Sequence, residues 1–282
     1  MDMPLTSNSI DKAIQVAFRN SRTLIDTDPE NAKVRLSELA EIGCTEAMVC
    51  LGVMYTDGDE NEREKAEGLF RRAAEMGDHS GMRNLAYIYA IGINVDMNKQ
   101  LAAEWYERSA RLGNPKAQCN LGVMYEFGNG VPQDYAEAAK WYSMSAVNGY
   151  FRGQTNLGVL ALEGKGIGRD PVLAAHLFSE AKSPRAYFQL AIQHIEGNGV
   201  ETDMKKAVEL LEDSHARGYA KASALLAKLT EDSDREHAVE LYTHAASKGN
   251  QDAIDWLASK GIDIPERVPR KKKRRIIPIN KG

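Results

Sequence analysis

Hydrophobic residues recur along this chain with a period of 31 to 36 residues. In each period a small residue, Ala or Gly, is followed four positions later by Leu and then at once by another small residue. Residues four apart share one face of an α-helix, so each occurrence predicts a helix with a narrow apolar stripe. The pattern occurs seven times, at Leu51, Leu85, Leu121, Leu157, Leu190, Leu226 and Leu257.

A second apolar block lies between consecutive leucines and predicts a second helix. It runs from an Ala to a Gly eleven residues later, as in Ala102 to Gly113, with large apolar residues such as Trp105 and Tyr106 between them. Residues that favour helix N-caps stand four positions before the Ala, at Asn98, Asp134, Asp170, Asp203 and Asp234. Glycines, which favour the left-handed backbone that ends helices, follow the first block at Gly58, Gly92, Gly128, Gly164 and Gly197. Each period is therefore a helix–loop–helix unit.

Stacked units of this kind predict an all-α protein, an α-α superhelix (solenoid) of about six to seven helix-loop-helix repeats. Residues 1–44 fit a degenerate, capping helix pair, and residues 45–264 hold the repeats with a terminal capping helix at 251–260. Atypical end units are expected because the terminal apolar faces of a solenoid have no neighbour. Residues 265–282 lie beyond the pattern. We expect one continuous solenoid rather than two globular domains.

The third unit resembles the Sel-1-like repeat, a family related to tetratricopeptide repeats but with a longer loop between its helices. The match includes Leu121-Gly122-Val123-Met124-Tyr125, Gly128-Asn129-Gly130-Val131, Asp134, Trp141-Tyr142 and Gly149. The resemblance extends over residues 45 to 260, although Ala161 and His194 stand where the pattern has Tyr and the first and sixth units lack the Gly-x-Gly-Val loop. It implies an interaction scaffold that gathers partners into complexes.

The same resemblance implies that the first helices line a concave surface, with the residues five and one before each repeat Leu pointing into it. Basic residues and amides form i, i+4 pairs at these offsets. Amides bond the backbone of an extended peptide, and Lys and Arg hold carboxylates or phosphates. We hypothesise a groove for an extended acidic or phosphorylated segment; the alternative is that the amides serve the repeat's own hydrogen bonding and the cations are solvated. The candidates are Asn84, Lys116, Asn120, Arg152, Asn156, Arg185, Gln189 and Lys221.

Chemistry other than binding has little support in the sequence. No motif for nucleophilic catalysis, phosphate binding or zinc binding occurs, so we expect no enzyme activity, no cofactor and no metal site. Gly128-Asn129-Gly130 and Gly164-Lys165-Gly166 follow predicted helices rather than strands, and we interpret them as turns. Three cysteines, Cys44, Cys50 and Cys119, are too few for a disulfide framework and predict buried, inert thiols in a reducing compartment.

The C-terminal segment carries the opposite charge to the rest of the chain. Residues 265–282 hold eight of the 36 basic residues and one of the 40 acidic residues, so this tail carries +7 and residues 1–264 carry −11. A cationic, Pro-containing segment of this kind is predicted to be disordered. It is typical of a nuclear-import signal or an arm for nucleic acid or an anionic membrane; a solubilising tail and a segment that folds back onto the acidic body are the alternatives. Its six consecutive cations are Arg270, Lys271, Lys272, Lys273, Arg274 and Arg275.

Composition sets the remaining limits. With 43% hydrophobic and 27% charged residues among 282, the chain is not wholly disordered. No apolar run approaches the length of a transmembrane helix, and Met1 to Ile10 lacks the regions of a secretory signal. We predict a cytoplasmic, non-enzymatic scaffold for protein partners, also nuclear if the source is eukaryotic. The alternative is a nucleic-acid-associated or nuclear protein in which the tail dominates.

Overall fold

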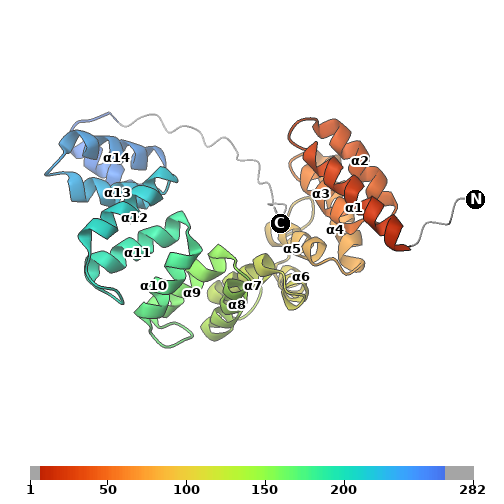
Figure 1. Ribbon diagram of the computed structural model, residues 1–282, viewed down its shortest axis with the longest axis horizontal. Helices are drawn as coiled ribbons and strands as arrows, with labels where there is room; N and C mark the ends of the chain where they lie inside the picture. Colours follow the sequence, from red (N-terminus) through yellow and green to blue (C-terminus); the bar gives the residue numbers. More distant parts are fainter. Residues whose placement is uncertain (1–6, 264–282) are drawn as a thin grey trace, which may run out of the picture. The chain divides into compact units, whose positions relative to one another are not determined.

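The computed structural model describes residues 7–263, and in this range the chain forms fifteen α-helices, which confirms the predicted all-α solenoid class (Figure 1). Residues 1–6 and 264–282, and with them the predicted basic tail, lie outside the described residues. The chain divides into two compact units, one ending at Gln133 and the other starting at Asp134. The division of the sequence into residues 1–44, 45–264 and 265–282 stays a prediction.

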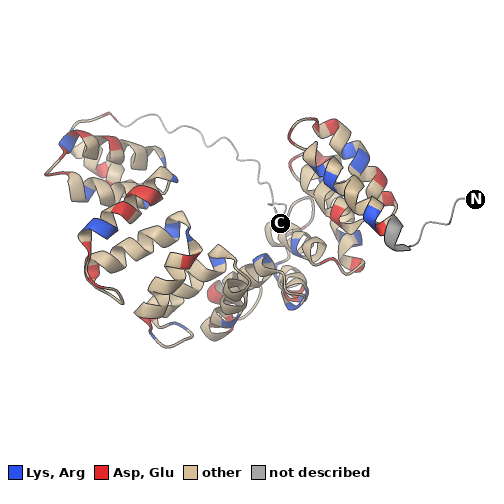
Figure 2. Ribbon diagram, viewed as in Figure 1, with Lys and Arg blue, Asp and Glu red and all other residues tan. Residues whose placement is uncertain are grey.

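The first unit contains seven helices. Helices next to each other in sequence pack together, and α3 also contacts both α1 and α5, so alternate helices lie side by side as a stacked repeat requires. Charges of both signs are interspersed along α1 and α2 (Figure 2). The helices are α1 (Ser7–Thr23), α2 (Pro29–Glu41), α3 (Thr45–Tyr55), α4 (Glu60–Glu75), α5 (His79–Ile91), α6 (Lys99–Arg111) and α7 (Pro115–Phe127).

The second unit contains eight helices with the same alternation. Its core is a continuous cluster that runs from Ala161 to Leu257 and includes the fully buried Phe178 and Leu211. The helices are α8 (Tyr135–Val147), α9 (Phe151–Glu163), α10 (Pro171–Ala181), α11 (Pro184–Glu196), α12 (Met204–Ala216), α13 (Ala220–Thr230), α14 (Arg235–Ser247) and α15 (Gln251–Ser259).

Side-chain caps begin the second helices where the sequence predicts them. The carboxylate of Asp134 accepts hydrogen bonds from the backbone N–H groups of Ala136 at 2.8 Å and Glu137 at 3.1 Å. These bonds satisfy two of the donors that a helix leaves open at its N-terminus. The other four predicted caps do the same for their helices: Asn98, Asp170, Asp203 and Asp234.

The predicted glycine ends are confirmed at four of five positions. Gly92, Gly128, Gly164 and Gly197 close α5, α7, α9 and α11 in the left-handed conformation. The prediction for Gly58 is wrong, because α3 ends in a right-handed cap at Thr56 and Gly58 has no positive φ. The first repeat lacks the long loop, and Asp59 caps α4 immediately after Gly58, so no left-handed turn is needed there.

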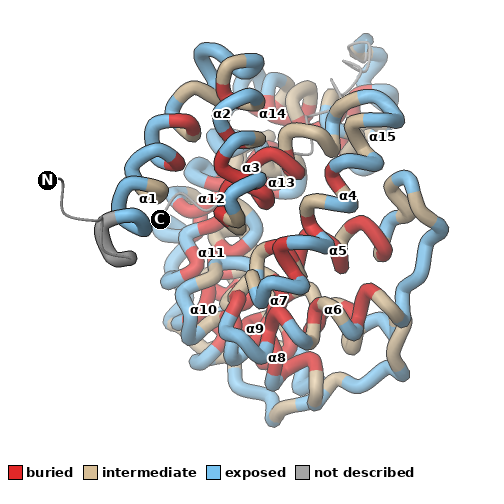
Figure 3. The backbone as a smooth tube through the Cα atoms, turned by 90° about the vertical axis from the view of Figure 1, so that its right-hand side faces the viewer, coloured by how far each residue is buried: buried red, intermediate tan, exposed pale blue. Residues whose placement is uncertain are grey.

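The small residue after the repeat Leu marks the place where the second helix crosses the first. A Cβ on Gly52 would lie 2.6 Å from a ring carbon of Phe70, and a Cβ on Gly158 would lie 2.6 Å from the same atom of Phe178. Both phenylalanines are fully buried. Figure 3 shows buried segments on α3 and α5 as well as on the other helices. The same close crossing therefore occurs in both units.

We expect Gly52→Ala to lower the free energy of unfolding by about 1–3 kcal/mol, because the methyl group would overlap the buried Phe70 ring. Gly68→Ala, in the middle of the adjacent α4, is the matched control. A Cβ at Gly68 meets nothing within 4 Å, so the higher helix propensity of Ala should stabilise the protein by about 0.5–1 kcal/mol. Urea unfolding measures both values. Equal effects of the two exchanges would contradict the close crossing.

Candidate functional site

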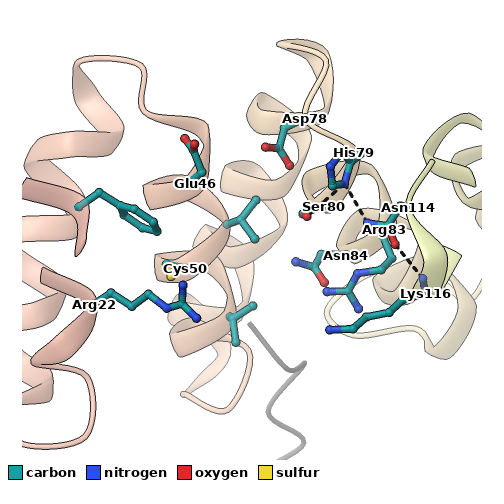
Figure 4. Close-up of a pocket in the computed structure, with 13 residues that line it drawn as sticks. Arg22, Glu46, Cys50, Asp78, His79, Ser80, Arg83, Asn84, Asn114 and Lys116 are labelled. Carbon is teal, nitrogen blue, oxygen red and sulfur yellow. Dashed lines mark hydrogen bonds between the residues drawn. The ribbon is translucent and has the colours of Figure 1, made fainter. Parts of the chain in front are cut away.

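A pocket of about 280 Å³ lies among the first helices of the first unit (Figure 4). We call it the first-helix pocket, and every residue that lines it comes from α1, α3, α5, the first turn of α7 or the caps of α5 and α7. Its apolar side is formed by α1 and α3, and its polar side mainly by α5 and α7. The lining residues are Phe18, Arg22, Glu46, Val49, Cys50, Val53, Asp78, His79, Ser80, Arg83, Asn84, Asn114 and Lys116.

Some of the residues at the two offsets that we expected to face a ligand line this pocket. Residues five before the repeat Leu contribute Glu46, Ser80 and Lys116, and residues one before it contribute Cys50 and Asn84. The structure therefore brings Asn84 and Lys116 together in one pocket, while Asn120 does not line it.

The predicted residues of the second unit lie on its own first helices. Arg152 and Arg185 are exposed, and the Arg185 guanidinium donates a hydrogen bond of 2.9 Å to the side-chain oxygen of Asn156. Gln189 is half-buried and Lys221 is exposed. One basic residue and one amide of neighbouring first helices are thus in contact, which the sequence offsets alone did not predict.

Asn84 differs from Asn120 although both stand one residue before a repeat Leu. The Asn120 amide is hydrogen-bonded to the hydroxyl of Tyr106, fourteen residues earlier on the preceding second helix. The residue fourteen before Asn84 is Phe70, which has no hydroxyl. Asn84 has 0% exposure, and neither its amide nitrogen nor its amide oxygen has a hydrogen-bond partner. An unsatisfied buried amide is rare in folded proteins and calls for an explanation.

Cationic groups outnumber carboxylates in the pocket lining, three to two. Both carboxylates already accept hydrogen bonds. Asp78 accepts from the Gly81 N–H at 2.7 Å, and Glu46 accepts from the Gln15 side chain at 3.1 Å. Burial alone would raise the pKa of Glu46, but hydrogen bonds from its own N–H and from neighbouring side chains outweigh it and hold that pKa below its usual value. The carboxylate of Glu46 therefore stays ionised and satisfied.

The three cations are Arg22, Arg83 and Lys116, of which the offsets predicted only Lys116. Arg83 is 8% exposed, and it could have been found as the basic neighbour of Asn84. Arg22 could not have been found from the sequence, because it lies on α1, which precedes the first recognisable repeat. The Cys50 thiol beside them is buried as predicted, and burial raises its pKa to about 12.

A second polar cluster lies in the second unit, where Ser223 of α13 stands between two histidines. The Ser223 hydroxyl is 2.8 Å from His215 Nδ1 and 2.9 Å from His244 Nδ1, and the two imidazole rings meet edge to face at 4.7 Å between centroids. Burial lowers the pKa of both histidines; nearby His237 adds to this for His215, and His215 and Lys248 add to it for His244. This cluster sits in helix packing and lines no pocket described here.

The sequence matches the Sel1 repeat family over six segments, and the chain belongs to that family. The matched segments are residues 45–78, 79–114, 115–150, 152–183, 184–212 and 229–250. Proteins of this family generally mediate protein–protein interaction and act as non-catalytic scaffolds. The resemblance noted from the sequence is thereby confirmed.

Two solved structures share the fold. A protective antigen present in uropathogenic Escherichia coli strains is 27% identical with a TM-score of 0.70; the match covers 89% of this chain but only 57% of the antigen. A Sel1 repeat protein from Oxalobacter formigenes is 26% identical with a TM-score of 0.67, and the match covers 78% of this chain and 93% of that protein. Comparison with curated proteins gave no match. No helix within residues 7–263 has the length and hydrophobicity needed to cross a membrane.

We expect Asn84→Leu to raise the free energy of unfolding by about 1–3 kcal/mol, because it replaces an unsatisfied buried amide with an apolar group of similar size. Asn120→Leu is the matched control and should lower it by about 1 kcal/mol or more, because it removes the partner of the buried Tyr106 hydroxyl. Opposite shifts in the urea midpoint are the expected result. A loss of stability from both exchanges would show that Asn84 is satisfied in the folded protein.

The histidine cluster predicts a loss of stability in mild acid. Both folded-state pKa values lie below the ordinary value of 6.5, so the unfolded chain binds protons more readily than the folded chain. Stability should therefore be fully present above pH 6.5 and decrease as the pH falls below it. His215→Gln with His244→Gln should flatten this decrease, whereas His176→Gln, exposed on α10, should leave it unchanged. Urea unfolding at a series of pH values is the measurement.

Proposed function

We propose that this chain is a non-enzymatic adaptor that binds an extended, acidic segment of a partner protein along its first helices. The observation that carries the proposal is the recurrence of a basic residue and an amide one helical turn apart on successive first helices. The pairs are Lys116 with Asn120, Arg152 with Asn156, and Arg185 with Gln189; in the first of these the amide is already bonded to Tyr106, so Lys116 is the group that would hold the ligand.

The chemistry of these pairs suits an extended peptide. An extended segment presents unpaired backbone N–H and C=O groups, which a side-chain amide can bond, and carboxylates, which Lys and Arg can hold. In the second unit the 2.9 Å contact of Arg185 with Asn156 brings the two kinds of group within reach of the same ligand atoms. In the first unit the same offsets line the first-helix pocket. In the first unit only Lys116 with Asn120 repeats the basic–amide pair, whereas the second unit has two such pairs.

A second candidate function rests on the cationic run Arg270–Arg275, which lies outside the described residues. A run of six cations would bind nucleic acid through phosphate contacts, without sequence preference and with strong salt dependence. In that case the helical repeats would recruit partners to nucleic acid. The same run would serve as an import signal in a eukaryote. Removal of residues 269–282 separates this function from peptide binding, which should be unaffected by the deletion.

The adaptor proposal predicts a charge-dependent loss of peptide binding. Arg152→Glu together with Arg185→Glu should weaken the binding of fluorescent twelve-residue peptides rich in Asp and Glu by about tenfold or more, and added salt should weaken the wild type similarly. Lys205→Glu with Lys140→Glu, on the second helices α12 and α8, makes the same change in net charge and serves as the control. Fluorescence anisotropy measures each affinity. Equal losses in the two double variants would reject a role for the first helices.

A further inference from the structure

We propose that the first-helix pocket is the anchoring site of the acidic segment, and that it binds a carboxylate together with an adjacent peptide group. This inference rests on the proposed function for its ligand class. It assigns the peptide group to the Asn84 amide and the carboxylate to the cationic groups around it. The carboxylate comes from an acidic side chain or from the C-terminus of a peptide, and the experiment below separates these two sources.

The first step is the missing partner of Asn84. In the following repeat the equivalent amide is bonded to Tyr106, but Phe70 occupies that place before Asn84 and provides no hydroxyl. The Asn84 amide therefore keeps both a donor and an acceptor inside a pocket, with no partner for either. A peptide group offers the complementary pair, a C=O that accepts and an N–H that donates. Binding such a group would relieve an unfavourable buried amide, so the site gains affinity from its own unsatisfied state.

The second step is the arrangement of charge. Figure 4 shows Asn84, Arg83 and Lys116 projecting into the space from α5 and α7, and Arg22 reaching toward it from α1 on the opposite side. In the same view Glu46 lies apart from these groups, and its hydrogen bonds to Gln15 and Thr45 keep it occupied. A guanidinium in a partly desolvated site holds a carboxylate with charge-assisted hydrogen bonds. The cations and the amide together thus define a site for a negative group beside a peptide bond.

The third step is size. A volume of 280 Å³ is at the low end of the roughly 300–1,000 Å³ of pockets for drug-sized ligands. It accommodates one or two residues of a peptide rather than a folded domain. Phe18, Val49 and Val53 line the opposite wall, where the aliphatic part of an acidic side chain can pack. Inorganic phosphate would use the cations but has no apolar part to pack against this wall.

The test uses the full chain labelled with ¹⁵N at asparagine, with NMR detection of the Asn84 side-chain NH₂ group. Three of the probes are acetylated tripeptides built on glycine. The first has a central Asp and an amidated C-terminus, and the second has a central Asn and an amidated C-terminus. The third has a free C-terminal carboxylate. Inorganic phosphate is the fourth probe. We expect saturable shifts of the Asn84 resonance with at least one carboxylate peptide and not with the Asn peptide. The stronger of the two carboxylate peptides identifies the source.

Two variants test the assigned groups. Asn84→Leu and Arg83→Gln should each weaken the binding of the active tripeptide by about tenfold, since one loses the bonds to the peptide group and the other a charge-assisted bond. Asn61→Leu and Arg35→Gln, exposed on α4 and α2, are the matched controls and should bind normally. A thermal melt of each variant checks that it is folded. If Asn84→Leu does not fold, the Arg83→Gln variant still tests whether the cations bind the carboxylate. The shift of the Asn84 resonance in the wild type still tests whether the amide binds the peptide group.

The outcomes separate the pocket from the adaptor function. Absence of a carboxylate-dependent shift at Asn84, or phosphate binding as strong as peptide binding with no effect of Asn84→Leu, overturns the pocket assignment. If twelve-residue acidic peptides still bind in an Arg152- and Arg185-dependent way, only the pocket fails. If the tripeptide binds at Asn84 but exchanges of Arg152 and Arg185 have no effect on longer peptides, the pocket stands and the groove along the second unit fails.

Discussion

The close crossing of the first and second helices is the constraint on which the rest of this structure depends. At Gly52 and at Gly158 the missing side chain admits the ring of a buried phenylalanine, with no room for even one methyl group. Because core packing is dense, such a contact fixes the separation and rotation of both helices together. The other positions of the repeat are then set relative to this point.

Because the helix packing is fixed in this way, a difference in one residue of the second helix decides whether the amide before the repeat Leu has a hydrogen-bond partner. Asn84 and Asn120 occupy the same place in consecutive repeats. The residue fourteen positions earlier is Phe70 for Asn84 and Tyr106 for Asn120. With Tyr106 present, the amide is part of the fold. With Phe70 present, the amide is buried without a partner and faces a pocket that is bordered by cations. The two repeats thus differ by one internal hydrogen bond at an equivalent position.

The two units use buried polar groups differently. In the first unit the unsatisfied Asn84 amide is one of the groups that line the first-helix pocket. In the second unit Ser223 and its two histidines are hydrogen-bonded to one another across α12, α13 and α14. The same helical framework therefore holds buried polar groups that have internal partners in one place and lack them in another.

The sequence alone predicts the fold class, the order of the helices and the caps such as Asp134, because these follow from local periodicity and capping chemistry. It did not determine the end of α3 near Gly58, where a short connection replaces the long loop. Nor did it reveal Arg22 as part of the pocket or Asn84 as unpartnered. Those facts depend on which side chains of distant helices meet, since the repeat period places residues in register but does not say whether a neighbour can complete their hydrogen bonds. Only the packing of the helices decided that.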